Sequence, residues 1–217
     1  MRASLFAAAT LAVLPSVAHA DSIDLKLLGM GASQIVTVGG VRNVTAYAGE
    51  IKWGADTDSV PGIDETFYAY CVDLLSNALS TQTVVEETLT NSAAGWLYNQ
   101  FAGAAHLDAA KAAGLQLAIW NALYDSDFTV DLIVGKTNTF YLQNGSTDAR
   151  KYANEFLKQL STAAVLTGSV TLFNARLGQD QITAAPVPEP ATLVLLGSGL
   201  AALAARRRMR KGSAPAA

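Results

Sequence analysis

The chain carries an uncharged apolar run near each end, and these two runs confine its folded part to the middle. The first run, Leu5–Val13, follows Arg2, and the second, Ala191–Ala205, precedes a basic C-terminus. Residues 21–185 lie between the two end segments, which is enough for one domain with a substantial core. No internal repeat or heptad pattern divides this segment. We therefore expect one domain between two short targeting segments.

Residues 1–20 have the order of features that is typical of a secretory signal peptide. A positively charged start is followed by the apolar run and then by the small-residue pattern Ala18-His19-Ala20. The run is too short to span a bilayer as a permanent anchor. We expect a cleavable signal helix here, with the exported mature chain beginning at Asp21.

Residues 186–211 have a different order. Pro188, Glu189 and Pro190 come first, and the two prolines keep the backbone extended, so a helix begins only after them. The apolar run then ends in a basic cluster formed by Arg206, Arg207, Arg208, Arg210 and Lys211. Such arginines can snorkel and extend a short spanning helix, and the positive-inside rule places them in the cytoplasm. This pattern predicts a C-terminal transmembrane helix, with residues 212–217 as a short cytoplasmic tail.

The string VPEPATLVLLGSGLAALAARRRMRK resembles the PEP-CTERM sorting signal, in which a Pro-Glu-Pro motif, a hydrophobic helix and a basic end follow one another. The resemblance implies an exosortase-type processing enzyme as partner, in bacteria that make exopolysaccharide. It also implies anchoring in the inner membrane before processing, and a later place on the cell surface or in the extracellular matrix. A plain single-pass anchor is the alternative.

Composition narrows the chemistry of the domain. Residues 21–205 carry 18 acidic and 9 basic side chains, a net charge of −9 that does not favour nucleic acid. After removal of the signal peptide the chain keeps one cysteine, Cys71, and one histidine, His106. Two such residues are too few for a zinc site built from histidine and cysteine. No G-x-S-x-G motif is present. We expect no metal and no cofactor.

The order of periodicities predicts an α+β domain. Glycine turns at residues 29–31 and 39–40 separate short β-branched or aromatic segments, and a run of apolar residues predicts a buried strand over 67–75. Helical spacing then replaces this pattern, with helix caps available near residues 90–92 and at Asp108. The expected strands are 23–28, 34–38, 44–53, 67–75, 170–173 and 179–183, and the expected helices begin near residue 92, at 108 and at 148. This order indicates an antiparallel β-sandwich or barrel with an inserted helical segment.

Two residues are unusual for their predicted elements. Cys71 lies in the middle of an expected strand, where a free cysteine is most often an inert core residue. Gln116 lies on the expected apolar face of the second helix, beside Ile119 and Trp120. A buried amide must find hydrogen-bond partners or it costs about 1–3 kcal/mol.

The segments YCVD at residues 70–73 and LQLAIW at 115–120 resemble the thioester domains of bacterial surface adhesins. In that family an aromatic-Cys strand and a Gln-x-x-Ile/Val-Trp helix supply the two residues of a Cys–Gln thioester. The resemblance implies a Cys71–Gln116 crosslink. An extracellular target, either a protein or a glycan with amine or hydroxyl groups, would attack this crosslink once and displace the Cys71 sulfur. The implied role is covalent adhesion or matrix crosslinking rather than enzymatic turnover, because each molecule would react once.

Three alternatives stay open. A non-reactive structural protein of the extracellular matrix or biofilm would carry the same sorting signal. A cysteine hydrolase would use His106 as the base for Cys71, with Asp108 behind it. Two groups of acidic residues could bind calcium, although neither has the pattern of an EF-hand loop: Asp56, Asp58, Asp64 and Glu65 form the first, and Asp125, Asp127 and Asp131 the second.

Peptide mapping of the termini of surface material tests the targeting segments. In a host with a matching exosortase, we expect the mature protein to begin at Asp21 and to lack the segment that follows Pro190. A mature chain that keeps residues 206–211 would contradict the sorting prediction and leave the export prediction intact.

Overall fold

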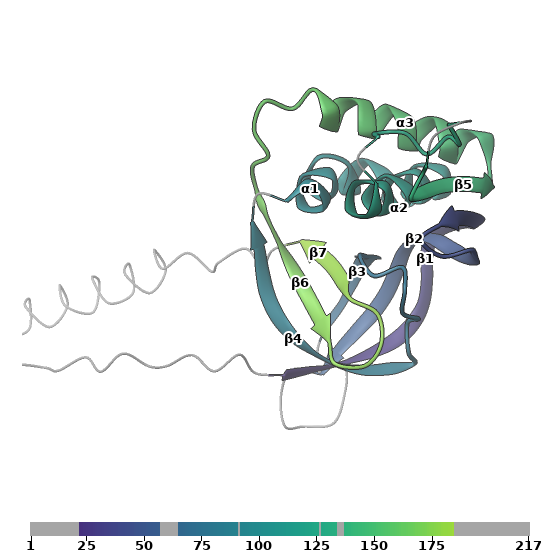
Figure 1. Cartoon of the computed structure of the whole chain (residues 1–217). Coiled ribbons are helices and arrows are strands. Elements are labelled where there is room, and N and C mark those ends of the chain that lie inside the picture. The colour runs from purple at the N-terminus through teal and green to yellow at the C-terminus, as the bar shows by residue number, and fades with distance from the viewer. Residues whose placement is uncertain (1–21, 57–64, 91, 126, 134–136, 185–217) are drawn as a thin grey trace, which may run out of the picture.

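The computed structural model describes residues 22–56, 65–90, 92–125, 127–133 and 137–184. These residues form a mostly antiparallel sheet and three helices, as the sequence predicts for an α+β domain (Figure 1). In chain order the elements are β1 (Ser22–Gly40), β2 (Val44–Asp56), β3 (Glu65–Cys71), β4 (Thr81–Thr90), α1 (Ala93–Ala105), α2 (Ala109–Tyr124), β5 (Phe140–Asn144), α3 (Thr147–Ser161), β6 (Ser169–Ala175) and β7 (Gln181–Ala184).

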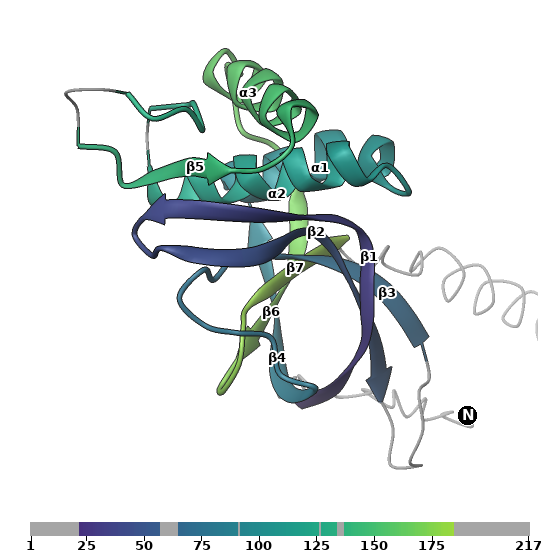
Figure 2. The same ribbon diagram turned by 90° about the vertical axis from the view of Figure 1, so that its right-hand side faces the viewer.

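The sheet closes on itself. Its strand order is β2-β3-β7-β6-β4-β1, and β1 pairs in turn with β2, so these six strands form a ring (Figure 2). All of the pairings are antiparallel. The helices lie across one end of the ring, where β5 adds to the far half of β1 (Figures 1 and 2). The two predicted options, sandwich or barrel, are thus resolved in favour of a barrel-like closure.

The N-terminal part differs from its prediction in one respect. The glycine-rich stretch 29–31 was expected to be a turn, but it lies inside β1, which runs for 19 residues. The register of β1 against β2 shifts between Leu27 and Gly29 and again between Met30 and Ser33, which is the mark of β-bulges. A bulge needs the same small residues as a turn, and this is why the local sequence suggested the wrong structure. Bending the long ribbon in this way allows one end of β1 to join the barrel and the other to reach the helices.

Helix boundaries follow the predicted caps closely. The Ser92 hydroxyl accepts a hydrogen bond from the backbone of Gly95, and the Asp108 carboxylate accepts two, from Ala110 and Lys111. Two strands were missed, β4 and β5, and the expected 67–75 strand ends at Cys71. In β4 a run of threonines and glutamates hides the alternation of buried positions.

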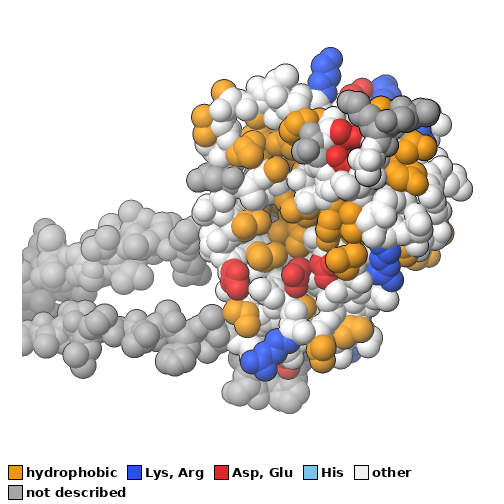
Figure 3. All heavy atoms as spheres, in the orientation of Figure 1, with side chains coloured by type: hydrophobic (Ala, Val, Ile, Leu, Met, Phe, Trp, Pro, Cys, Tyr) orange, Lys and Arg blue, Asp and Glu red, His pale blue; other side chains and the backbone are white. Residues whose placement is uncertain are grey.

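Helix α2 is buried all round over most of its length, unlike a surface helix with one apolar stripe. It lies beside α1, below α3 and over the barrel (Figure 1), so every residue from 112 to 121 is buried. Gly114 and the polar Asn121 are buried there, whereas Leu123, near the end of the helix, is exposed. A Cβ on Gly114 would come within 3.1 Å of the α3 backbone, so α2 and α3 pack at close range. In Figure 3, hydrophobic side chains gather along the seam between the helical layer and the barrel.

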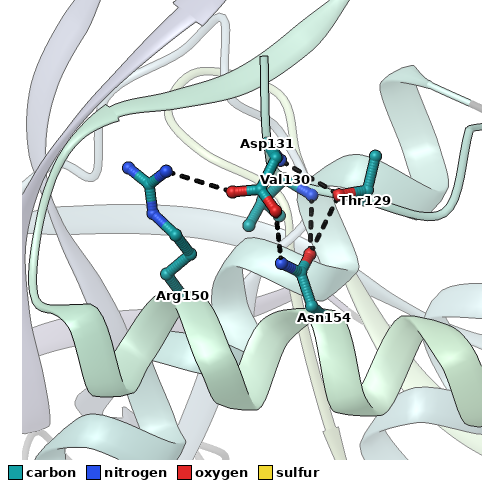
Figure 4. A network of polar contacts seen from close by, with 5 residues as sticks. All are labelled: Thr129, Val130, Asp131, Arg150 and Asn154. Atoms are coloured by element: carbon teal, nitrogen blue, oxygen red, sulfur yellow. Dashed lines mark hydrogen bonds and ion pairs between the residues drawn. The ribbon is translucent and has the colours of Figure 1, made fainter. Parts of the chain in front are cut away.

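The segment 127–133 is fastened to α3 by polar contacts (Figure 4). The Asn154 side chain accepts from the Val130 backbone and donates to Asp131, and Arg150 donates to the same carboxylate. Asp127 accepts hydrogen bonds from the side chains of Asn121 and Asn138. The acidic residues of the second calcium candidate therefore serve hydrogen bonds that hold this segment in place. In the first candidate, residues 57–64 lie outside the described residues.

No helix within the described ranges is long and apolar enough to cross a membrane. The expected signal helix at 1–20 and the expected C-terminal spanning helix both fall outside those ranges.

Trp120→Ala tests the buried position of α2. Trp120 is 2% exposed and its ring centroid lies 6.3 Å from that of Phe140. We expect the free energy of unfolding to fall by about 3–5 kcal/mol, the usual cost of truncating a large buried aromatic side chain. Leu123→Ala on the same helix is the control, because its side chain is exposed and the change should cost less than about 0.5 kcal/mol. Equal denaturant midpoints for the two variants would show that α2 packs differently.

Candidate functional site

The site forms where β2 and β3 part. The last pair between these strands is Ile51 with Ala69, while on its other edge β3 remains paired with β7 through Cys71. The backbone N–H and C=O of Cys71 are therefore left without a strand on the β2 side. Buried backbone groups of this kind need partners.

The side chain of Gln116 takes the place of the missing strand. The Cys71 N–H donates to Gln116 Oε1 at 2.9 Å, and Gln116 Nε2 donates to the Cys71 carbonyl at 2.8 Å. Both residues are buried, at 2% and 1% exposure. The structure thus brings together two residues 45 positions apart, and the carboxamide carbon of one lies against the backbone of the other. The buried amide that the sequence left without partners is satisfied.

The Cys71 side chain is buried away from water. Its S–H donates to the Asp73 carbonyl at 3.1 Å. Burial raises the pKa of the Cys71 thiol far above its usual range, and the nearby Asp73 and Asp180 carboxylates add to this. The Trp120 indole N–H acts in the opposite direction by hydrogen bonding toward the sulfur, which is a weak acceptor. That N–H has no oxygen or nitrogen acceptor among the described residues.

This arrangement contains the parts of an acyl transfer. A hydrogen bond from the Cys71 N–H to Gln116 Oε1 polarises the carboxamide and would stabilise negative charge on that oxygen when the sulfur attacks. Attack forms the C–S bond and breaks the C–N bond, and the thiol proton leaves with the ammonia. The overall reaction therefore consumes no external base, and it can start from a protonated thiol.

Side chains from three other parts of the chain hold the segment that follows Cys71 in place. Tyr124 accepts from the Leu74 N–H at 3.1 Å, and Arg42 donates to the Leu74 and Leu75 carbonyls at 3.2 and 2.9 Å. Gln179 donates to the carbonyls of Asp73 and Ser76. None of these three residues was singled out from the sequence, because each reaches the site only through the tertiary fold.

His106 belongs to a different cluster. Its Nδ1 lies 2.9 Å from Glu50 Oε1, and its ring packs against Tyr68. Asp108, expected behind His106 in the hydrolase alternative, instead caps α2 and pairs with Lys111 at 3.0 Å. The Cys–His–Asp arrangement of that alternative is therefore wrong. Glu50 is 2% exposed and was not identified from the sequence, where a single glutamate within a strand carries no signal.

Residues 186–208 match the PEP-CTERM protein-sorting motif. The match includes Pro188, Glu189 and Pro190 and extends into the basic cluster, all of which lie outside the described residues. The motif marks the chain as an exported protein that an exosortase recognises and that is anchored in the membrane before surface release.

No curated protein matches the chain. Among solved structures, the N-terminal thioester domain of a surface protein from Clostridium perfringens aligns with 76% of this chain and 99% of its own, at 12% identity and a TM-score of 0.41. A TM-score of this size does not establish a shared fold, so the site must be judged on its own geometry.

The raised pKa of Cys71 has a consequence for stability in a chain with a free thiol. A folded-state pKa above the unfolded value stabilises the domain below the unfolded pKa and loses that contribution as pH rises above it. We expect Gln116→Ala protein to lose about 2 kcal/mol more than Gln116→Ala/Cys71→Ala between pH 8 and 10, given an unfolded thiol pKa near 8.5. Urea unfolding at each pH measures this, and parallel pH profiles for the two proteins would show that the thiol is solvated.

Proposed function

We propose that this exported, surface-sorted protein attaches covalently to an extracellular target through a thioester between Cys71 Sγ and the side-chain carbonyl of Gln116. A thioester is an electrophile that survives while water is excluded from it. A target amine attacks the Gln116 carbonyl carbon, displaces the sulfur and leaves an amide. Each molecule reacts once, so the role is adhesion or matrix crosslinking rather than turnover.

The observation that carries this proposal is the reciprocal pairing of Gln116 with the backbone of Cys71. Because both hydrogen bonds run to the same residue, the carboxamide is held beside the backbone of the residue whose side chain must attack it. The pairing also excludes water, since both residues are almost fully buried. Holding two reactants at contact distance is worth several kcal/mol of barrier in reactions of this kind.

A non-reactive structural protein of the matrix is the second candidate. The same pairing favours it too, because two short hydrogen bonds satisfy every group involved without any covalent bond. On this view Gln116 is a structural replacement for a strand and Cys71 an inert core residue.

The intact mass of the folded domain, purified without nucleophilic buffers, separates the two candidates. We expect it to be lower than the sequence mass by one ammonia, and methylamine should convert it to the methylamine adduct. The adduct should carry one thiol that reacts with a labelling reagent after unfolding, because Cys71 is 2% exposed in the fold. Cys71→Ala and Gln116→Ala should both show full sequence mass and no adduct.

Two further variants serve as controls. Gln100→Ala removes an exposed glutamine of α1 and should behave as the wild type. His106→Ala should also keep the ammonia deficit, because His106 contacts Glu50. A wild-type domain that is folded, has full sequence mass and ignores methylamine would overturn the thioester and leave the structural protein.

A further inference from the structure

We infer that Gln181, Asp73 and Asp180 form the side of the Cys71–Gln116 site that receives the target, and that they select a primary amine arriving as its positively charged ammonium ion. This inference rests on the proposed thioester. It concerns residues that take no part in forming that bond. It also favours an amine target, such as a lysine side chain, over the hydroxyl groups of a glycan.

Gln181 supplies the first observation. It pairs directly with Cys71 across the β3–β7 ladder, so the two side chains project from the same face of the sheet. Its Nε2 donates to the carbonyl and side-chain oxygens of Gln179 at 3.4 and 3.1 Å. Its Oε1 has no donor among the described residues, although the residue is 0% exposed. A buried acceptor without a donor is costly, and the N–H of an incoming amine would satisfy it.

The two carboxylates supply the second observation. The Asp73 carbonyl accepts from the thiol, and the Asp180 carbonyl accepts from the Val72 N–H at 3.0 Å, so these residues flank Cys71 from just after β3 and just before β7. Each carboxylate keeps one oxygen on a backbone N–H, at 2.8 Å from Leu75 and from Ala175. Neither forms an ion pair within the described part of the chain.

The position of these carboxylates suits the capture of a cation. Both residues are half-buried, whereas the neighbouring Cys71 is buried. Arg42 reaches the same segment, and its guanidinium donates to two backbone carbonyls there. Two negative charges in a partly desolvated site attract an ammonium ion more strongly than the same charges would in water.

The reaction can be written in balance. The ammonium ion gives one proton to solvent, and the neutral amine nitrogen attacks the carbonyl carbon of Gln116. The C–S bond breaks as the new C–N bond forms, and a second proton moves from nitrogen to sulfur. The products are an amide on Gln116 and the free thiol of Cys71. Gln181 Oε1 would accept from the amine nitrogen during its approach.

The test compares two small nucleophiles by mass spectrometry on the thioester-bearing domain at pH 8. Methylamine is almost wholly cationic at this pH, whereas hydroxylamine is neutral. We expect Asp180→Asn and Asp73→Asn to slow methylamine roughly three- to tenfold and to leave hydroxylamine unchanged, because only the cation gains from the charge. Gln181→Met should slow methylamine roughly tenfold through loss of the acceptor. Glu155→Gln, which removes an exposed charge on α3, is the control and should change neither rate.

The possible outcomes distinguish a failure of this inference from a failure of the proposed thioester. An asparagine keeps an oxygen for the backbone N–H that each aspartate serves, so these variants should fold even where Gln181→Met does not. Variants that keep the ammonia deficit and react with both nucleophiles at wild-type rates would overturn this inference and leave the thioester standing. A wild-type domain of full sequence mass would overturn both.

Discussion

The pairing of one glutamine side chain with the backbone of one cysteine organises this domain. At the point where β2 leaves β3, an amide on a helix supplies the donor and the acceptor that a strand would have supplied. The helical layer is thereby tied to the barrel through its most deeply buried helix. The second bulge of β1 lies opposite the stretch from Ile51 to Gly49, where β2 leaves β3, and Gly114 lets α2, the helix that carries Gln116, pack closely against α3.

The same contact links structure to chemistry. An apolar surrounding that leaves the thiol protonated would also protect a thioester from water, and the backbone N–H that caps the strand points at the oxygen where charge would develop. Stability and reactivity therefore draw on one set of hydrogen bonds. Two of the buried polar groups that lack an oxygen or nitrogen partner, on Trp120 and Gln181, lie beside this contact, and other such groups lie elsewhere in the described core.

Much of the fold could be predicted from local patterns. The helix caps at Ser92 and Asp108 were readable because capping depends on a few neighbouring residues. Strand β4 was missed because polar residues obscure its alternation, and the stretch 29–31 was misread because a bulge and a turn need the same glycines. The faces of α2 could not be read from periodicity, since a helix enclosed on all sides has no polar stripe.

The sequence by itself determined the address of the protein and the chemical identity of its candidate site. The sorting motif at 186–208 is a linear signal, and residue types alone exclude a histidine–cysteine zinc site. Only the tertiary structure decided that Cys71 meets Gln116, that His106 meets Glu50 instead, and that Gln181 and two aspartates lie near Cys71. The physical reason is that such contacts depend on strand register and on the point where two strands separate. Both are set by long-range hydrogen bonding and packing, which leave no periodic trace in the local sequence.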